Sequence, residues 1–275
     1  MPASSLSNTL PLTVAPRVSW RRKGDGGSFA LKRVLQLALS HYGSGVMPRQ
    51  KRIDEAGTVY HALNRGNARQ MIFHKHEDYE AFIRVLADGL EKYSVQLFSF
   101  TLMPNHWHLV LRPTHDGQMG KFLRWVTATH SLRYHAHYHT LGEGHIYQAR
   151  YKSFPVQDDS HFYVLCRYVE RNPVRANLVE RAENWQYGSL YRWNQSVEPS
   201  PQILSPWPIP RLPKWIQRVN EPLSEKELKA VRTSVDRGRP FGDDEWTEEM
   251  AETHGVWFTL RPIGRPRKKK KAAPP

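Results

Sequence analysis

Three scarcities in this 275-residue chain limit what it can be. It has one cysteine, Cys166, so no internal disulfide framework can form, and a reducing cytoplasm is the expected compartment. It has no run of 18 or more apolar residues, which excludes a helical membrane span. Acidic residues are nearly missing from both ends, with one in residues 1–53 and none in residues 258–275. The 39% of hydrophobic residues is still enough for one core of ordinary size.

The positive charge is concentrated at the two ends of the chain. The formal net charge is +14, of which +8 lies in residues 1–53 and +7 in residues 258–275, so residues 54–257 carry −1. A near-neutral body with basic ends is typical of a protein that holds a polyanion with its ends. Tails that only improve solubility are the simpler alternative.

Composition divides the chain into four segments. Residues 1–46 show no sustained period and are interpreted as a disordered basic segment. This segment also resembles a transit peptide, but the basic stretch and strand that follow Met47 favour a start of translation at that residue. Residues 47–195 have the periodic pattern of one domain. Residues 196–221 are a linker or a segment strapped to the surface, because six of the fifteen residues 199–213 are prolines. Residues 222–275 are a basic helical extension.

The apolar pattern of the domain gives an order of elements. Expected are a strand at 58–64, a helix at 76–93, strands at 95–103 and 107–112, a helix at 118–137, a strand at 151–156, and a helix from Asp158 or Asp159 to about Val169. This order predicts an α+β fold of the ferredoxin-like, split βαβ type, with an antiparallel sheet and helices on one face. Many functions use this layout, so the fold alone does not indicate the activity.

Two histidines flank a tryptophan on the third expected strand. Residues two apart on a strand face the same side, so His106 and His108 point one way and Trp107 points into the apolar layer. Two neighbouring imidazoles make a bidentate platform for a metal ion. Such a pair also occurs by accident on surfaces and in cores, so it needs companions.

The companion is a tyrosine with an asparagine four residues later. Tyr168 and Asn172 are expected on one face of a helix, one turn apart. A phenol beside a metal ion can attack a phosphodiester, and the amide oxygen of Asn172 can complete the metal's ligands. In the structural alternative, Tyr168 packs in the core and Asn172 caps the helix before Pro173.

Four motifs in the same order resemble one family of enzymes. The strand MPNHWHLVL resembles the metal-binding strand of HUH endonucleases, and YVERNPVRA is similar to the nucleophile helix of their single-tyrosine branch. YHALNRGN and YQARYKS resemble segments of REP-associated tyrosine transposases, which are IS200-like. The motifs begin at Met103, Tyr168, Tyr60 and Tyr147, and they cover roughly residues 47–193. The piece at Gly238–Gly242 resembles the basic C-terminal extension of longer members.

The resemblance implies an activity, a metal and a set of site residues. The expected reaction is cleavage and rejoining of single-stranded DNA at or near REP-like hairpins, with a covalent 5′-phosphotyrosine at the position matching Tyr168. The resemblance implies a divalent ion, Mg or Mn, at the positions matching His106, His108 and Asn172, in the HUH endonuclease fold. The residues themselves leave zinc equally open, because imidazole suits zinc.

The expected partner is single-stranded or hairpin DNA, with no membrane and no small-molecule substrate. A monomer and a homodimer are both open, and a bacterial cytoplasmic protein associated with the nucleoid is expected. Candidate DNA contacts are the basic residues Arg49, Lys51, Arg52, Arg65, Arg150, Lys152, Arg237, Arg239, Arg265 and Arg267. The string Arg237–Pro240 matches the core of minor-groove-binding AT-hook peptides, with a plain turn as the alternative. Lys152, Arg150 and Arg167 are candidates for the basic group that assists the tyrosine.

Two other functions compete with the transposase. One is a catalytically silent regulator that binds hairpin DNA or RNA on the same scaffold. The other is a metal-dependent phosphodiesterase in which water, not Tyr168, attacks the phosphate. The complete set of His106, His108, Tyr168 and Asn172 favours the enzyme with a tyrosine nucleophile.

Overall fold

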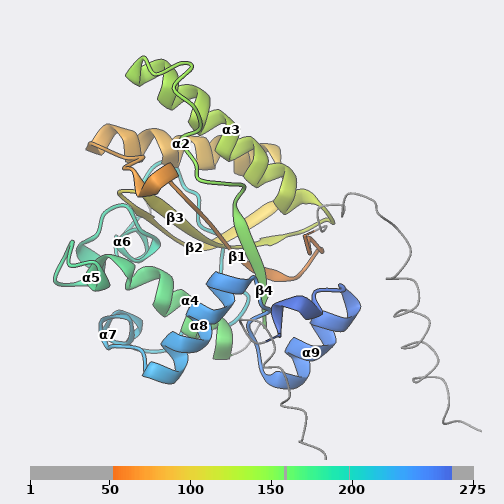
Figure 1. Ribbon diagram of the computed structural model, residues 1–275. Helices are drawn as coiled ribbons and strands as arrows, with labels where there is room; N and C mark the ends of the chain where they lie inside the picture. Colours follow the sequence, from red (N-terminus) through yellow and green to blue (C-terminus); the bar gives the residue numbers. More distant parts are fainter. Residues whose placement is uncertain (1–51, 158–159, 198, 262–275) are drawn as a thin grey trace, which may run out of the picture. The chain divides into compact units, whose positions relative to one another are not determined.

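The computed structural model describes residues 52–157, 160–197 and 199–261 (Figure 1). The chain divides into two units, Met1–Gln50 and Lys51–Pro275, and every described residue belongs to the second. Several sequence-based expectations therefore lie outside the described residues. These are the segment 1–46 with the start at Met47, the DNA contacts Arg49, Lys51, Arg265 and Arg267, and the helix cap at Asp158 or Asp159.

A four-stranded antiparallel sheet is the centre of the described part. Its strands are β1 (Val59–Arg65), β2 (Val95–Met103), β3 (His106–Pro113) and β4 (Lys152–Val156), in the order β2-β3-β1-β4. β2 and β3 form a hairpin whose turn contains Pro104 and Asn105, as this turn-forming pair predicts. In the register, Leu63 of β1 lies opposite both His108 of β3 and Lys152 of β4.

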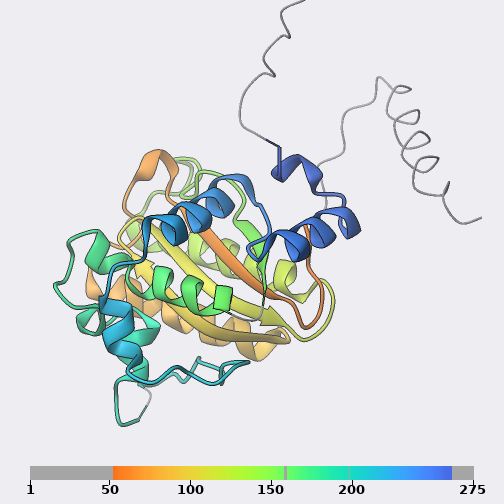
Figure 2. The same ribbon diagram turned by 90° about the horizontal axis from the view of Figure 1, so that it is seen from below.

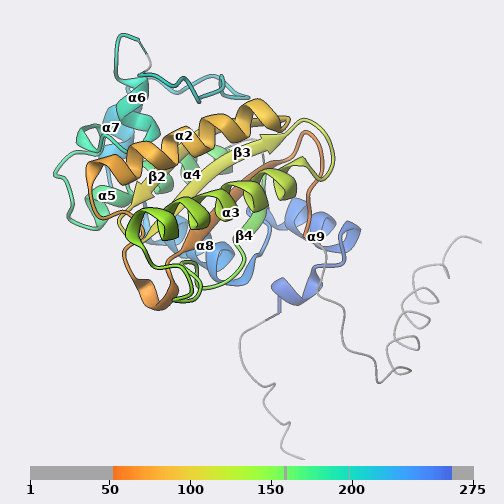
Figure 3. The same cartoon turned by 90° about the horizontal axis from the view of Figure 1, so that it is seen from above.

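Two long helices cover one face of the sheet (Figure 3). These are α2 (His76–Lys92) and α3 (Gln118–Tyr138), which pack beside each other. Their apolar side chains, among them Phe82 of α2 and Phe122 and Val126 of α3, form one core cluster with strand residues such as Trp107 of β3. The helical spacing of Leu132 from Phe122 and Val126 predicts a core position, but its side chain is 67% exposed. The buried stripe of α3 instead runs through Met119, Leu123 and His130.

The opposite face is covered by α4 (Ser160–Glu170) and α8 (Glu225–Arg237), as Figure 2 shows from below. A second core cluster joins Val110 and Phe154 of the sheet to Phe162 and Leu165 of α4. The α+β class and the antiparallel sheet are confirmed. The helices, however, lie on both faces rather than on the single expected face. The reason is that both faces of the strands are apolar: every residue of β2 except Gln96 is buried.

The Pro-rich segment packs closely on the domain. The backbone amide of Ser205 donates to the carbonyl of Leu97 at 2.8 Å, and Nε1 of Trp207 donates to the carbonyl of Phe98 at 2.9 Å. The segment is therefore strapped to the surface of the domain and is not a free linker. The remaining short elements are η1 (Asn67–Arg69), α5 (Asn172–Arg175), η2 (Ala182–Asn184), α6 (Ser189–Trp193), α7 (Trp215–Asn220), α9 (Asp244–Thr253) and η3 (Trp257–Thr259).

The C-terminal helices also pack against the sheet domain. Ser224 caps α8 with reciprocal hydrogen bonds to Glu227, as the capping-box spacing predicts. Phe241 is buried in the same cluster as α4, and its backbone amide donates to the carbonyl of Pro155 at 2.9 Å. Residues 222–261 are therefore part of the same unit as the sheet. Within the described ranges, no helix has the length and apolar character required to cross a membrane.

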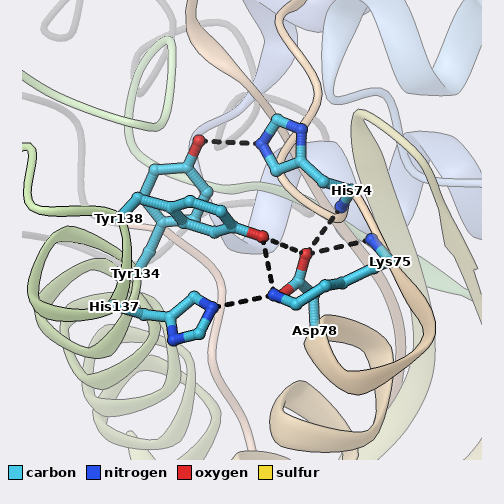
Figure 4. A network of polar contacts seen from close by, with 6 residues as sticks. All are labelled: His74, Lys75, Asp78, Tyr134, His137 and Tyr138. Atoms are coloured by element: carbon cyan, nitrogen blue, oxygen red, sulfur yellow. Dashed lines mark hydrogen bonds and ion pairs between the residues drawn. The ribbon is translucent and has the colours of Figure 1, made fainter.

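A polar network ties the start of α2 to the end of α3 (Figure 4). The carboxylate of Asp78 accepts hydrogen bonds from the Tyr138 hydroxyl at 2.6 Å, the His74 backbone amide at 2.7 Å and the Lys75 ammonium at 2.9 Å. The His74 ring pairs with the Tyr134 hydroxyl at 3.0 Å. Burial acts to raise the pKa of Asp78, but the hydrogen bonds from Tyr138 and Lys75 outweigh it and hold the pKa at about 2.

Asp78→Asn is expected to lower the free energy of unfolding by about 1 kcal/mol at pH 7, because it weakens the first turn of α2 and its link to α3. The pKa of Asp78 is below its ordinary value of 3.8 in the folded protein. The stabilisation is therefore complete above about pH 4 and is lost as the pH falls towards 2. Denaturant unfolding of both proteins at pH 7 and pH 3 measures this, and a difference that does not shrink at pH 3 contradicts it.

Candidate active site

His106 and His108 point from β3 towards α4, and Trp107 points to the other face. The two imidazole centroids lie 5.0 Å apart, with His106 partly exposed and His108 only 3% exposed. Trp107 is fully buried, and its Nε1 donates to the Tyr147 hydroxyl at 3.0 Å. The structure thus has the alternation that the His-Trp-His sequence predicts.

Each of these histidines is held through its Nδ1 atom. Nδ1 of His106 lies 2.6 Å from Oδ1 of Asn105, and Nδ1 of His108 lies 2.9 Å from Nε2 of His61 on β1. Neither Nε2 atom of His106 and His108 has a hydrogen-bond partner among the described residues. A neighbour on Nδ1 fixes the orientation of an imidazole and leaves Nε2 to bind a ligand.

His61 is a residue of this site that was not among the candidates predicted from the sequence. It is fully buried, and its ring stacks on that of His108 with centroids 5.0 Å apart and an angle of 10° between the planes. Its Nδ1 atom has no hydrogen-bond partner in the described structure. The usable signal was its position in the strand, because His61 faces the same side of the sheet as His108 once β1 and β3 pair.

Burial keeps all three imidazoles neutral at pH 7. Loss of solvation lowers the pKa of His61 to about 3 and the pKa of His106 to about 4, and it takes the pKa of His108 well below its usual range. The positive charges of Arg65 and Arg175 lower the pKa of His106 and His108 further. The neutral imidazole is the form that binds a metal ion.

Tyr168 lies against these histidines from α4. Its side chain is 5% exposed, and its ring meets His108 edge to face at 6.0 Å between centroids and His61 at 6.4 Å. The Tyr168 hydroxyl makes no hydrogen bond to the residues that the structure describes. The phenol ring is therefore packed against His61 and His108.

Arg175 covers Tyr168 and holds Asn172. Its guanidinium carbon lies 4.4 Å from the centroid of the Tyr168 ring, and its Nη2 donates a short hydrogen bond to Oδ1 of Asn172. Asn172 is buried, begins α5 rather than continuing α4, and has an Nδ2 atom without a partner in the described ranges. Arg175 is thus the cation in contact with the tyrosine, and it was not among the residues predicted for that role.

The basic residues predicted to assist Tyr168 are placed elsewhere. Arg167 donates to the carbonyls of Arg218 and Glu221, at 2.9 and 3.2 Å, and so anchors α7. The ammonium of Lys152 lies 3.4 Å from the carbonyl of Val235 on α8. Arg150 is exposed and lines a groove on the α3 side of the sheet. The signal for Arg175 was its spacing, three residues after Asn172.

Two of the predicted DNA contacts lie near the ends of sheet strands. Arg65 is exposed at the end of β1, where it lies opposite His106 in the register. The guanidinium of Arg52 stacks on the ring of Tyr151 at 4.2 Å and donates to the Tyr151 carbonyl at 2.5 Å. Both residues therefore present positive charge close to the end of β1 or the start of β4.

The predicted contacts at the end of α8 have partners within the chain. Arg237 donates to the carbonyls of Thr259 and Phe258 at 2.8 and 3.1 Å, and Arg239 lies 3.6 Å from the carboxylate of Asp244. Gly238 is the left-handed residue that ends α8, with φ 68°. The string Arg237–Pro240 is thus a helix-ending turn, which is the alternative to an extended minor-groove-binding peptide.

The histidine pair fits a divalent metal ion as two nitrogen donors. Both Nε2 atoms lack a hydrogen-bond partner in the described ranges, and burial keeps both rings neutral. Among the residues that the structure describes, no group of three or more His, Cys, Asp and Glu side chains is placed to hold a metal. The third predicted ligand, Asn172, has its amide oxygen engaged by Arg175. The site therefore fits a metal through His106 and His108, and no carboxylate from the described part of the chain completes it.

One protein-family model matches the part of the chain that contains all four strands. Residues 56–172 match the model of the family described as "Transposase IS200 like". Residues 56–172 form an IS200-like transposase domain. The matched range includes His61, His106, His108, Tyr168 and Asn172. The match confirms the resemblance to IS200-like transposases that the four sequence motifs predict.

Two solved structures are similar to the chain that carries this transposase domain. A REP-associated tyrosine transposase bound to a REP hairpin has a TM-score of 0.45 and 14% sequence identity, and the match covers 61% of this chain and 99% of that one. A putative transposase from Deinococcus radiodurans R1 has a TM-score of 0.33 and 17% identity, with 44% of this chain and 95% of that one covered. The curated protein sequences contain no match.

Proposed function

We propose that the transposase domain cleaves and rejoins single-stranded DNA at or near hairpins, with Tyr168 as the nucleophile. The observation that carries this proposal is the setting of Tyr168. Its ring lies against His61 and His108, its hydroxyl is free of hydrogen bonds to described residues, and the guanidinium of Arg175 covers it. A tyrosine that only filled the core would not need two buried histidines and a cation around it.

The positive charge next to Tyr168 favours attack on a phosphodiester. A tyrosine has an ordinary pKa near 10, so at pH 7 its oxygen needs help to become a nucleophile. Arg175 supplies positive charge at the ring and is itself exposed. Together with the exposed Arg65 it can bind the non-bridging oxygens of a phosphate placed over His106 and His108.

The proposed step exchanges one phosphoester bond for another. The Tyr168 oxygen forms a bond to phosphorus and loses its proton to solvent. The bond from phosphorus to the 3′ oxygen of the preceding nucleotide breaks, and that oxygen takes up a proton to become a 3′-hydroxyl. Because the number of phosphoester bonds is unchanged, a 3′-hydroxyl can attack the phosphotyrosine in reverse. The DNA is then rejoined and the tyrosine is free again.

A divalent ion, magnesium or manganese, is proposed to be held by His106 and His108, with Asn172 as third ligand once Arg175 releases its amide oxygen. When bound, such an ion neutralises the charge of the scissile phosphate. Asn105 and His61 keep the two imidazoles in position through their Nδ1 atoms. Arg175 moves from Asn172 to the phosphate in this scheme.

Formation of a covalent adduct tests the proposal. The full chain is incubated with Mg²⁺ or Mn²⁺ and an end-labelled single strand that contains a hairpin, and the products are separated on a denaturing gel. A labelled band at the mass of the protein plus a DNA fragment is expected with the single strand and not with a blunt duplex of the same sequence. Hairpin binding without an adduct would instead support a silent regulator, and cleavage without an adduct would support attack by water.

Arg175→Gln is expected to slow adduct formation by about 100-fold or more, because preorganised charge at the reacting group is removed. The affinity for the uncleaved strand should change by less than about tenfold, since the effect is mainly on the reaction step. Single-turnover rates and strand affinities of the variant measure this. Arg181→Gln is the control, because Arg181 is exposed and pairs with Glu183 at 2.6 Å. Equal rates in the two variants would contradict the role of Arg175.

A further inference from the structure

A groove lies between α3 and the segment 142–151, on the opposite side of the sheet from the histidine pair. Its volume is about 800 Å³. The segment 142–151 follows the end of α3 and leads back along the sheet to β4 (Figure 3). On the α3 side, small and polar residues recur at helical spacing along one stripe. These are Gly120, Arg124, Thr127, Ala128, Ser131 and His135. The small side chains of Gly120, Ala128 and Ser131 leave room for a groove that runs along more than three turns of α3.

Positive charge is collected in this groove without a carboxylate in its lining. The lining includes Arg52, Arg124 and Arg150. Arg124 and Arg150 have no ion pair or hydrogen-bond partner among the described side chains and backbone groups, and Arg52 stacks on Tyr151. The carboxylate of Asp54 lies beside one end, but it accepts hydrogen bonds from two backbone amides in the first turn of α3.

Several arginines elsewhere in the described structure hold the chain together. Arg167 and Arg171 donate to backbone carbonyls of α7 and the residues around it, and Arg192 donates to the carbonyls of Pro199 and Pro201. In the groove, Arg52 also donates to a backbone carbonyl, that of Tyr151, but Arg124 and Arg150 are not used in this way. No carboxylate in the lining offsets the three positive charges. A concave surface of one sign concentrates a ligand of the opposite sign.

We propose that this groove binds a few nucleotides of single-stranded DNA next to the cleavage site, an inference that rests on the proposed function. A cavity of this volume encloses a ligand of drug size, which corresponds to a short stretch of one strand. A protein that binds a duplex specifically typically buries about 1,000 Å² or more of its surface in the contact. Guanidinium groups bind phosphates, and the planar Arg52 guanidinium beside Tyr151 offers a stacking surface for a base.

One end of the groove reaches the strand that borders the histidine site. Asn64 of β1 lines the groove, and its side-chain amide donates to the carbonyl of Ala149 at 3.3 Å. The next residue, Arg65, is exposed and lies opposite His106 in the register of β1 and β3. A DNA strand that leaves the groove at Asn64 therefore passes the charge of Arg65 before it reaches the histidine pair.

Site-directed photocrosslinking identifies what occupies the groove. Ala128 and Ala136 are both exposed on α3, but only Ala128 lines the groove. Each of Ala128→Cys and Ala136→Cys is labelled with a benzophenone maleimide, which the buried Cys166 does not compete for. Light-dependent crosslinking to a single-stranded oligonucleotide is expected to be at least about tenfold stronger from position 128. Equal yields, or a crosslink from position 128 only with duplex DNA or only with RNA, would overturn the proposal.

Charge reversal tests the same groove through affinity. The double variant Arg124→Glu/Arg150→Glu is expected to bind single strands at least about tenfold more weakly, with a salt slope smaller by roughly 1.4 for the two lost phosphate contacts. Lys121→Glu/Arg133→Glu is the matched control, because it reverses two charges on α3 outside the lining. Thermal unfolding of all variants verifies the fold.

The two proposals fail in different ways. Equal affinity losses in the two double variants, with a normal adduct at Tyr168, would overturn the groove and leave the proposed function standing. A specific crosslink at position 128 without any adduct in the wild-type protein would do the reverse. The groove would then be a binding site for single strands in a protein that does not cleave them.

Discussion

Tyr168→Phe is expected to abolish the protein–DNA adduct, with cleavage slowed by at least about 1,000-fold, while binding of the hairpin strand stays within about threefold of wild type. The substitution removes one oxygen atom, and in the proposed reaction that atom is the nucleophile. The ring contacts with His61 and His108 do not involve the oxygen, so the packing of α4 on the sheet is kept. Gel-based adduct assays and fluorescence anisotropy measure the two quantities.

Another tyrosine of the same helix provides the control for this experiment. Tyr163 also lies on α4, and its hydroxyl donates to the carbonyl of Pro210 at 2.5 Å. Tyr163→Phe should leave the adduct unchanged, with a small loss of stability from the missing hydrogen bond. Cleavage that continues at the wild-type rate in Tyr168→Phe would show that water is the nucleophile.

His106→Ala is expected to reduce adduct formation by at least about 100-fold and to weaken Mn²⁺ binding by about tenfold or more, because one of two nitrogen donors is lost. His106 is only partly buried, so the substitution leaves a smaller cavity than replacement of the buried His108 would. Mn²⁺ binding is followed by electron paramagnetic resonance, which does not depend on activity.

The control for the metal measurement is His115→Ala. His115 is exposed in the loop that follows β3, outside the histidine site. It should bind Mn²⁺ and form the adduct like the wild-type protein. Unchanged Mn²⁺ affinity in His106→Ala would show that the histidine pair is not the metal site, whatever happens to activity.

Most of the local structure could be predicted from the sequence, because the period of apolar residues is itself a local property. The helix expected at 76–93 is α2 at His76–Lys92, and the strands expected at 95–103 and 107–112 are β2 and β3 within one residue. The strand order and the helices on both faces depend on contacts between distant residues. In the structure every residue of β2 except Gln96 is buried, so this strand has cover on both faces.

The site could be predicted where two of its residues share one element. His106 and His108 lie on one strand, so the period of two places them together. His61 was missed because its hydrogen bond to His108 joins residues 47 positions apart and depends on the register of β1 and β3. Arg175 was missed because the chain leaves α4 after Glu170 and begins α5 at Asn172, which turns the guanidinium back over Tyr168.

The roles of the basic residues were the least predictable part. Charge can be counted in a sequence, but whether an arginine is free depends on the carbonyls and carboxylates around it after folding. Arg167 and Arg237 look equivalent to Arg150 in the sequence, yet they bind backbone carbonyls while Arg150 remains available in the groove. For the described residues, our proposal therefore places the DNA contact on the α3 side of the sheet and not at the end of α8.

Mapping the residue that becomes linked to DNA is the most direct test of the central claim. The adduct formed by the wild-type protein is treated with nuclease and trypsin, and the peptides are sequenced by mass spectrometry. Trypsin cleaves after Arg167 and Arg171, so a short peptide that begins at Tyr168 is released. The account predicts a nucleotide on the oxygen of Tyr168 in this peptide, whereas a nucleotide on any other residue would contradict it.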